Sequence, residues 1–502
     1  MTEESRSSRS ATEDSESAYL GRFGHEQKLH RVMGVYSSFA LAITVLTITV
    51  TLFTLYSAGF ESVGGVAVWL WLPVIAFGVL LTYVWGHLAA SIPLSGVSYQ
   101  WCSRLVGPRY GFIAGWTQVI AWYLGTAAIA VSAGTVFAPV LFTHPTTTEI
   151  QLTATIAVVI ATVANLVHVR VAAMVNNIGT SIELGVTILI GVMIAVGLAF
   201  FHGHQGLSFL TSAKPVGGGS INFDSISAAL LLPAFTILGW DAAADLAEES
   251  RDTRLIAPKS MTRAVLFGGA LCFLLYVLLG LAIPGSPAKF FAEPGNPLLN
   301  LIQFRFGSLM TYVVEVAVGW AFMSAIVANI AAASRISYGL ARDNMFPASR
   351  AWAKLGRRSR TPVVAILMAG ALGVLFNYVS AGIASRALAI VAVAGYGVYA
   401  LICAAVIIAS MRGRIPIPDE GFRNLGKWMT PASIVGLGWC ILVMVFLILP
   451  GSGHTGAVYF LVAEALGLLW LIVGLNSRIR RGSCGPSLIW SVDATGPTGA
   501  GN

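Results

Sequence analysis

Residues 233–241 read PAFTILGWD and lie in an apolar segment that spans roughly residues 226–247. Pro233 lacks an amide hydrogen and clashes with the preceding helical turn, and Gly239 has the weakest helix preference of any residue except proline. A helix that contains both is expected to break between them. Asp241 follows, and a carboxylate at membrane depth costs about 2.5 to 3.5 kcal/mol on insertion scales. The stretch predicts an interrupted helix that offers backbone groups and a carboxylate to a ligand. A proline-kinked packing helix is the alternative.

The composition is that of a membrane protein. Of the 502 residues, 56% are hydrophobic and 10% are charged, whereas about 25% of residues are charged in soluble domains. Twelve apolar segments are each long enough to cross a hydrocarbon core of about 30 Å. They cover approximately residues 35–60, 66–90, 111–142, 150–169, 172–201, 225–247, 264–284, 308–334, 361–379, 387–410, 431–450 and 456–476. We therefore predict an all-α, polytopic protein of the lipid bilayer, with twelve transmembrane helices and both termini on one side.

Basic residues indicate which side the termini occupy. With a cytoplasmic N-terminus, only four of the 30 lysines and arginines lie outside: Lys214, Lys289, Arg305 and Arg386. This asymmetry follows the positive-inside rule, and it predicts a multi-pass protein of the cell (plasma) membrane with both termini cytoplasmic. The same asymmetry explains the net charge of +8, so nucleic acid is not an expected partner.

The distribution of apolar residues divides the chain into regions. We predict a disordered cytoplasmic tail at residues 1–18, a ten-helix core at 19–410, a cytoplasmic loop with two additional transmembrane helices at 411–480, and a cytoplasmic tail at 481–502. The first 30 residues contain no apolar stretch typical of a cleaved signal peptide, so the first span is expected to direct insertion.

The first apolar segment carries a second candidate break. Threonines lie along its centre: Thr44, Thr47, Thr49, Thr51 and Thr54. Such side chains are stiff and their hydroxyls compete for backbone carbonyls, so the helix is expected to unwind near residues 48–52. Ordinary threonine contacts between membrane helices are the alternative. The first and sixth segments lie five crossings apart, an odd number, so two units of five helices would be inserted in opposite directions. We predict a 5+5 inverted repeat plus two C-terminal helices, with both breaks facing each other.

Other polar residues within apolar segments have local explanations. His87 is expected to hydrogen-bond a neighbour near the cytoplasmic face, because no second metal ligand stands at suitable spacing. Glu183 is either a proton site or an acid neutralised by a structural partner, and both remain open. No metal site, disulfide framework or cofactor is expected, because the cysteines show no metal-type spacing. They are Cys102, Cys272, Cys403, Cys440 and Cys484.

Three stretches read together are similar to the signatures of one family. They are LGRFGHEQKLHRVMGVYSSFA (20–40), GWDAAADLAEESRDTRLIAPKSM (239–261) and SRISYGLARDNMFP (334–347). They resemble the amino acid, polyamine and organocation (APC) superfamily of permeases, most closely its amino acid and choline transporter branch. The middle stretch is the most specific, because its spacing across a helix end and a loop is hard to produce from apolar composition. The similarity covers about residues 19–480.

The resemblance implies a sodium-symporter-like architecture in which unwound parts of the first and sixth helices bind the substrate. It places these parts at residues 47–52 and 235–241. The chain departs from many relatives, which have glycines where it has Thr49 and Thr51, and commonly a lysine where it has Glu183. That lysine is thought to stand in for a sodium ion, so the acid leaves the coupling mechanism open.

The predicted substrate site combines both breaks. Its residues are Thr47, Ile48, Thr49, Val50, Thr51, Phe235, Thr236, Gly239, Trp240 and Asp241. Amides at the start of a half-helix, together with threonine hydroxyls, suit a carboxylate. Carbonyls freed by the break and the carboxylate of Asp241 suit an ammonium group, and Phe235 and Trp240 offer aromatic faces for cation–π attraction.

A gate is predicted on the cytoplasmic side. Arg31 precedes the first segment, and Glu248 and Glu249 follow the sixth. We expect an ion pair between Arg31 and these glutamates to hold the inner side closed.

Together these features predict a secondary active transporter for a small amino acid or related amine, with a co-transported proton and coupling through Glu183. A choline, polyamine or other organocation carrier, or a substrate exchanger, is the alternative. A channel would want rings of like charge, and a membrane enzyme would want clustered His, Asp or Glu. Neither is seen, and no phosphate-binding P-loop is present.

Overall fold

The computed structural model describes residues 31–142, 144–200, 203–357, 359–379, 384–450 and 454–486, together with Gly21, Phe23 and Leu29. The predicted tail at residues 1–18 lies outside this part of the chain. Residues from 487 onward, which make up most of the predicted C-terminal tail, also lie outside it.

Helices form almost all of the regular structure. Among the described residues there is no strand, only isolated backbone bridges between Met33 and Ser250 and between Leu355 and Pro362. The α-helices are α2 (Val35–Leu46), α3 (Ile48–Val63), α4 (Trp71–Ser91), α5 (Val97–Leu105), α6 (Pro108–Leu141), α7 (Thr147–Val167), α8 (Val169–Gly197), α9 (Phe223–Thr236), α10 (Ala242–Asp245), α11 (Thr253–Ala282), α12 (Pro287–Phe291), α13 (Pro297–Arg342), α14 (Ser349–Trp352), α15 (Val363–Val379), α16 (Ala384–Met411), α17 (Met429–Ile448), α18 (His454–Trp470) and α19 (Asn476–Arg480). Short helices of other kinds are η1 (Gly64–Leu70), η2 (Leu207–Thr211), η3 (Ala247–Glu249), η4 (Gly426–Trp428) and η5 (Leu471–Leu475). The predicted all-α class is confirmed.

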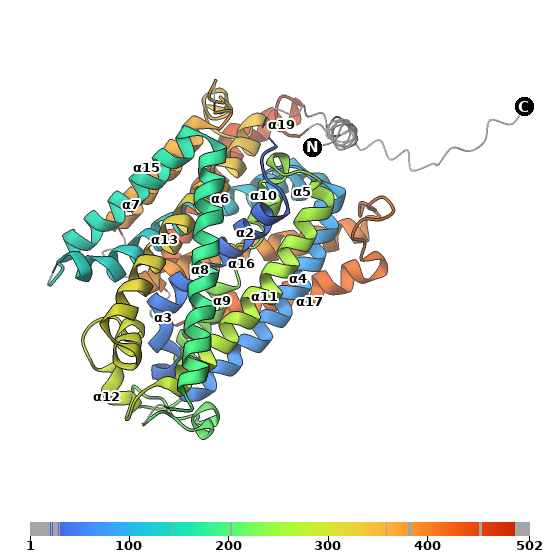
Figure 1. Cartoon of the computed structure of the whole chain (residues 1–502). Helices are drawn as coiled ribbons and strands as arrows, with labels where there is room; N and C mark the ends of the chain where they lie inside the picture. Colours follow the sequence, from blue (N-terminus) through green and yellow to red (C-terminus); the bar gives the residue numbers. More distant parts are fainter. Residues whose placement is uncertain are drawn as a thin grey trace, which may run out of the picture.

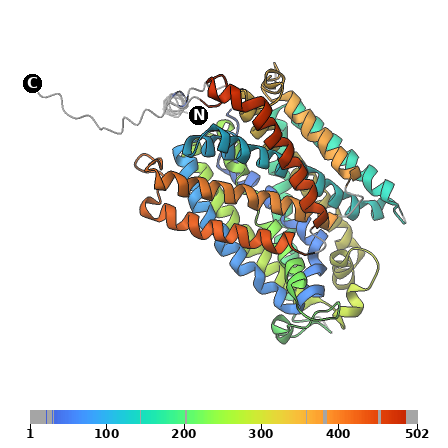
Figure 2. The same ribbon diagram turned by 180° about the vertical axis from the view of Figure 1, so that it is seen from behind.

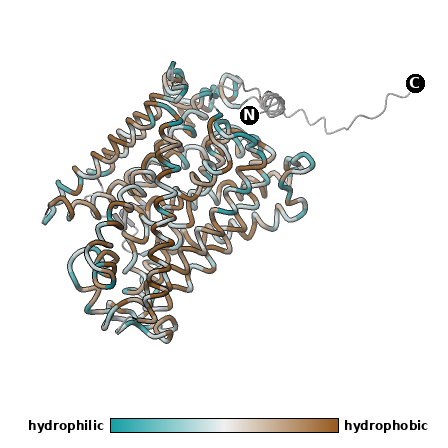
Figure 3. The backbone as a smooth tube through the Cα atoms, in the orientation of Figure 1, coloured by the Kyte–Doolittle hydropathy of each residue, from teal (hydrophilic) through white to brown (hydrophobic). Residues whose placement is uncertain are grey.

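Many of these helices suit a membrane. In the described part, nine helical stretches are long and apolar enough to cross a bilayer, and one of them, Val35–Ser91, contains α2, α3 and α4. Two shorter apolar helices, Phe223–Thr236 and Val363–Tyr378, add to them. Outward-facing apolar side chains such as Val159 and Val192 are about half exposed, which fits contact with lipid tails. Hydrophobic colours run along the helices, whereas hydrophilic colours gather at their ends (Figure 3). The chain is therefore a multi-pass membrane protein.

The helices run together as one bundle. In Figure 1, α5 and α19 lie at one end of the bundle and α12 lies at the opposite end. Helices α4, α11 and α17 lie side by side, and Figure 2 shows α17 and the segment from α18 to α19 on the outer face seen from behind. The interrupted pairs α2–α3 and α9–α10 are mostly buried between the other helices. This arrangement places both breaks in the interior of the bundle.

Candidate functional site

The first helix breaks at one residue. Thr47 adopts a left-handed conformation (φ 52°, ψ 42°) between α2 and α3. The predicted unwinding at residues 48–52 is therefore misplaced, because these residues form the first turn of α3. The Thr51 hydroxyl donates to the carbonyls of Thr47 and Ile48 at 2.9 and 3.1 Å, bonds that a helical turn accommodates. The threonine hydroxyl thus stabilises the turn after the break instead of unwinding it.

The sixth helix breaks where the sequence indicates. Helix α9 ends at Thr236, and α10 begins at Ala242. Gly239 has a φ of 86°, which strongly favours glycine. A Cβ atom at Gly239 would also lie 2.4 Å from Val45 Cγ1 and 3.3 Å from the Trp122 ring. Glycine is therefore required both for the backbone conformation and for the close approach of the first helix.

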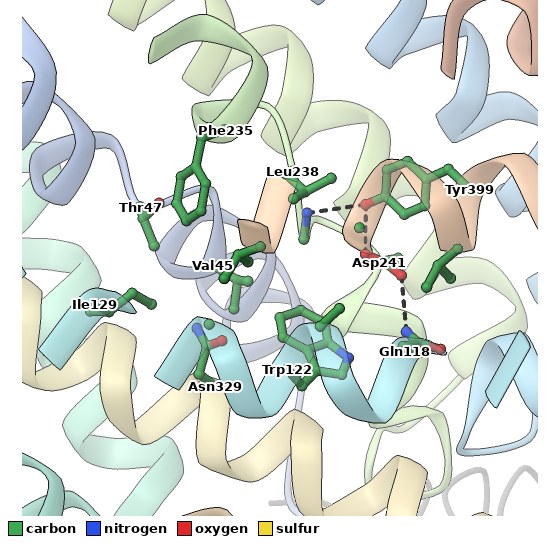
Figure 4. Close-up of a pocket in the computed structure, with 16 residues that line it drawn as sticks. Val45, Thr47, Gln118, Trp122, Ile129, Phe235, Leu238, Asp241, Asn329 and Tyr399 are labelled. Carbon is green, nitrogen blue, oxygen red and sulfur yellow. Dashed lines mark hydrogen bonds between the residues drawn. The ribbon is translucent and has the colours of Figure 1, made fainter. Parts of the chain in front are cut away.

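The two breaks meet at a central cavity. The hydroxyls of Thr51 and Thr236 are 2.7 Å apart and join the two helices. Beside them lies a small cavity of about 40 Å³. Its wall consists of Val45, Thr47, Gln118, Ala121, Trp122, Gly125, Ile129, Phe235, Leu238, Gly239, Asp241, Asn329, Val391, Gly395, Val398 and Tyr399 (Figure 4). Most of these side chains are apolar, and two of the polar ones, Gln118 and Tyr399, hydrogen-bond to Asp241.

Asp241 is the charged residue of this wall. Its side chain is 2% exposed, and Oδ1 accepts a hydrogen bond of 2.8 Å from the Tyr399 hydroxyl. The Gly239 amide in turn donates to that hydroxyl oxygen at 3.0 Å. The Gln118 amide nitrogen donates to Oδ2 at 3.3 Å (Figure 4). The carboxylate is thus oriented by α16, by α6 and by the broken backbone itself.

Asp245 is a second buried acid that the sequence analysis missed. Its side chain is 0% exposed, and Oδ2 accepts from Gln118 Nε2 and from Trp122 Nε1, both at 3.1 Å. Gln118 therefore bridges two carboxylates four residues apart in the sequence. Among the described residues, no basic side chain forms an ion pair with either acid. Two like charges at this depth repel, which favours binding of a proton or another cation by the pair.

The predicted substrate residues divide into two groups. Thr47, Phe235, Gly239 and Asp241 line the central cavity. The other six lie outside its wall: Ile48, Thr49, Val50, Thr51, Thr236 and Trp240.

Packing explains why three of these six residues lie elsewhere. Ile48 and Val50 belong to the first turn of α3 and are buried in the hydrophobic core. The Trp240 ring packs against the Trp85 and Tyr399 rings, at centroid distances of 5.6 and 5.3 Å. The aromatic face expected from Trp240 is therefore supplied in the wall by Tyr399 and Phe235.

Glu183 is a residue of α8. Its side chain contacts the start of α3, beside the first break. Its side chain is 3% exposed, and Oε1 accepts a hydrogen bond of 3.0 Å from the Thr49 amide. This amide belongs to the first turn of α3, where backbone donors have no partner within the helix and the helix dipole favours negative charge. The other oxygen, Oε2, has no hydrogen-bond partner. Glu183 and Thr49 share a second small cavity with apolar residues that include Phe53 and Leu298.

The two gate glutamates pair with arginines of α13. Arg335 Nε lies 2.6 Å from Glu249 Oε1, and both side chains are 2% exposed. Arg342 Nη1 lies 3.0 Å from Glu248 Oε2. Arg335 and Arg342 of α13 thus pair with the two glutamates, which the sequence analysis did not predict, and a gate formed with Arg31 stays a prediction.

The segment that contains Arg31 nevertheless lies against the same place. The amides of Val32 and Met33 both donate to the Glu249 carbonyl at 3.0 Å. Arg31 itself is half-buried. The start of the first helix, the end of the sixth and α13 therefore converge at one end of the bundle.

His87 has the role expected of it. Its Nδ1 accepts from the Leu425 amide at 3.2 Å, so Nε2 carries the proton and donates to the Pro416 carbonyl at 2.8 Å. This histidine fixes the loop between α16 and α17 to α4. Among the described residues, no cluster of three His, Cys, Asp or Glu side chains is placed to hold a metal ion.

Comparisons with known proteins agree on one family. The family model described as "Amino acid permease" matches residues 33–473. "Amino-acid permease 2" of Neurospora crassa is 23% identical over 458 residues, which cover 88% of this chain and 83% of that protein. "Amino-acid permease BAT1" of Arabidopsis thaliana is 25% identical over 470 residues, covering 87% and 89% of the two chains. "Branched-chain amino acid permease BcaP" of Bacillus subtilis is 24% identical over 408 residues, covering 78% and 80%. The chain therefore belongs to the amino acid permease family of the APC superfamily and is a transporter, not an enzyme.

Proposed function

We propose that this protein is a secondary active transporter that carries a small amino acid or related amine by alternating access around its two broken helices. The observation that carries the proposal is the cavity at which both breaks meet, with the buried carboxylate of Asp241 in its wall. The names of the relatives support an amino acid as the substrate. We further propose twelve membrane crossings, arranged as a 5+5 inverted repeat with two helices added at the C-terminal end.

The cavity offers separate places for the two ends of an amino acid. On one side, Thr47 stands at the N-terminal end of α3, where the positive end of the helix dipole suits a carboxylate. Across the cavity, Asp241 suits an ammonium group, and the Phe235 and Tyr399 rings provide aromatic faces beside it. A choline, polyamine or other organocation carrier would use the second place alone.

Uptake assays test the proposal directly. Labelled amino acids, and amines without a carboxylate, are offered to proteoliposomes with and without a pH gradient. We expect concentrative uptake of an amino acid when the outside is more acidic. Uptake of amines alone would favour the organocation carrier, and exchange without net accumulation would favour an exchanger.

The proposed topology places both termini in the cytoplasm of a cell membrane. Lys289 in α12 and Arg357 after α14 are both exposed and lie on opposite sides of the membrane in this topology. Lys289→Cys should react with an impermeant maleimide added outside intact cells, and Arg357→Cys should react only after permeabilisation. The reverse pattern would contradict the orientation.

Glu183 is the proposed coupling residue. Its unpartnered Oε2 and its contact with the broken helix would let a proton at this site alter the packing of α3. Glu183→Gln keeps the shape and can still accept from Thr49, but it cannot carry a proton. With a gradient of one pH unit, accumulation coupled to one proton reaches about ten-fold, the equivalent of about 1.4 kcal/mol. We expect the variant to lose this accumulation and to retain exchange of substrate across the membrane.

A matched variant controls for loss of a buried acid elsewhere. Glu464 in α18 is half-buried and lies far along the chain from both breaks. Glu464→Gln should accumulate substrate normally. If Glu183→Gln also accumulates normally, the coupling role is wrong, and if it fails to reach the membrane folded, Glu183 is a structural residue.

A further inference from the structure

A larger hollow lies on the outside of the bundle, between α4, α11 and the loop that leads into α17. Its volume is about 850 Å³. The three cationic side chains in its wall are Arg254, Lys259 and Arg423, and the aromatic ones are Tyr83, Phe422 and Trp428. It is separate from the central cavity, with which it shares no residue.

Arg423 is held in place by an aromatic ring and a hydroxyl group. The Arg423 guanidinium carbon lies 4.6 Å from the centre of the Tyr83 ring, and Nη1 donates to the Thr262 hydroxyl at 2.5 Å. The aliphatic stem of Arg423 lies over Gly86, where an added Cβ would be 2.6 Å from Arg423 Cδ. No carboxylate among the described residues forms an ion pair with Arg423 or Lys259. Their positive charge is therefore available to an external anion.

The surrounding loop is also fixed. His87 bonds to Pro416 and Leu425 on either side of the hollow's loop residues. The Arg254 guanidinium stacks 3.8 Å from the centre of the Phe422 ring and pairs with Asp419 at 2.8 Å. The positive-inside rule alone would explain basic residues in this loop, but it does not require them to be oriented around a hollow.

The hollow continues into a lipid-facing surface. Apolar side chains of its wall are exposed, including Leu255 of α11 and Val435 of α17. Further along the same two helices, Leu266, Leu274 and Ile441 are about half exposed. These helices lie side by side with α4 (Figures 1 and 2). A ligand that fits this surface has an anionic head beside an apolar tail.

We propose that this hollow binds an anionic phospholipid of the cytoplasmic leaflet. Arg423 and Lys259 contact the phosphate, Trp428 lies at the level of the headgroups, and the acyl chains lie along α11 and α17. Basic hollows between helices at the membrane–water interface suit anionic headgroups. Tryptophans are also common at this interface. The leaflet follows from the topology proposed above, but the binding itself does not depend on the direction of transport or on the transported substrate.

Native mass spectrometry of the full chain in detergent tests this site. Phosphatidylglycerol and phosphatidylcholine with the same acyl chains are added at equal concentration, and we expect phosphatidylglycerol to bind at least about five-fold more tightly. Each basic residue near such a headgroup contributes roughly five-fold in affinity, the equivalent of about 1 kcal/mol. Lys259→Gln should therefore lower phosphatidylglycerol binding about five-fold, and Lys259→Gln with Arg423→Gln about 25-fold. Asp419→Asn removes a negative charge beside Arg254 and should therefore raise the affinity for phosphatidylglycerol.

Arg414→Gln is the matched control. Arg414 lies in the same loop, is exposed and is not part of the hollow, so this variant changes the net charge equally without touching the site. Its phosphatidylglycerol binding should equal that of the unmodified protein. Equal loss in Arg414→Gln and Lys259→Gln would overturn the proposal in favour of diffuse charge attraction. Equal binding of both lipids, or full competition by sn-glycerol 3-phosphate without acyl chains, would overturn it as well.

Discussion

Arg335→Ala should open the central cavity toward the end of the bundle where Arg335 pairs with Glu249, which is the cytoplasmic end in the proposed topology. The Arg335–Glu249 pair is almost fully buried and is joined by two hydrogen bonds, of 2.6 and 3.2 Å. Loss of the arginine leaves the glutamate charge buried without a partner, a change that costs about 3 to 5 kcal/mol. The unpaired charge destabilises the closed arrangement, in which α13 packs on Glu249. It does not destabilise the open arrangement, so the population of the open arrangement rises. A cysteine at Ala121 in the cavity wall should then react with a cytoplasmic maleimide roughly 100-fold faster or more.

Two further variants separate the ion pair from general damage. Combining Arg335→Ala with Glu249→Ala removes the unpaired charge, so the double variant should be closer to the unmodified protein than the single one. Asp419→Asn breaks a pair whose acid is 55% exposed. Such pairs contribute about 0 to 1 kcal/mol, so this variant should leave the maleimide reactivity nearly unchanged. Unchanged reactivity in Arg335→Ala, or a double variant as reactive as the single one, would show that this pair does not close the cavity.

Asp241→Asn should weaken binding of an amine-bearing substrate by about 30-fold or more. Loss of one partner from a buried, hydrogen-bonded charge pair costs about 2 to 5 kcal/mol in affinity. The asparagine oxygen can still accept from Tyr399, whereas the bond from Gln118 to Oδ2 is lost. Equilibrium binding of labelled substrate to the purified protein measures the effect. Asp224→Asn, an exposed acid at the start of the same α9 helix, is the control and should bind normally.

The same binding assay decides between the two substrate classes. An amino acid carrier should lose affinity for the amide and for the decarboxylated analogue of its substrate, because the N-terminal end of α3 at Thr47 then has no carboxylate to bind. A choline or polyamine carrier should bind the amine as well as the amino acid. Normal binding in Asp241→Asn would remove Asp241 from the site in either case.

Local sequence was enough to predict one break and not the other. Pro233 and Gly239 disfavour a helix by themselves, so the interruption of the sixth helix follows from residue type. Threonine has no preference for positive φ, and nothing in the first segment distinguishes Thr47 from its neighbours. Just after it, Thr49 and Thr51 bond to Glu183 and Thr236 far along the chain, and a single sequence does not reveal such contacts.

Side-chain partners were the hardest part of the site to predict. Charge and position alone put Arg31 near Glu249, and the backbone of that segment is indeed there. The choice of Arg335 as ion-pair partner depends on how α13 packs against the end of the sixth helix. Asp245 was one helical turn from Asp241, but only the structure shows that Gln118 joins them.

Thr47 also limits the order in which the chain can assemble. A left-handed residue costs roughly 1 to 2 kcal/mol, and the bonds that offset it reach Glu183 and Thr236, which are 134 and 185 positions from their partners. Neither partner has been synthesised when the first segment enters the bilayer. At that stage residues 35–63 are most stable as one continuous helix, about 43 Å long at 1.5 Å per residue, which must tilt in a hydrocarbon layer of about 30 Å. The arrival of α8 and α9 then bends this tilted helix at Thr47, so a late step of membrane folding creates the break.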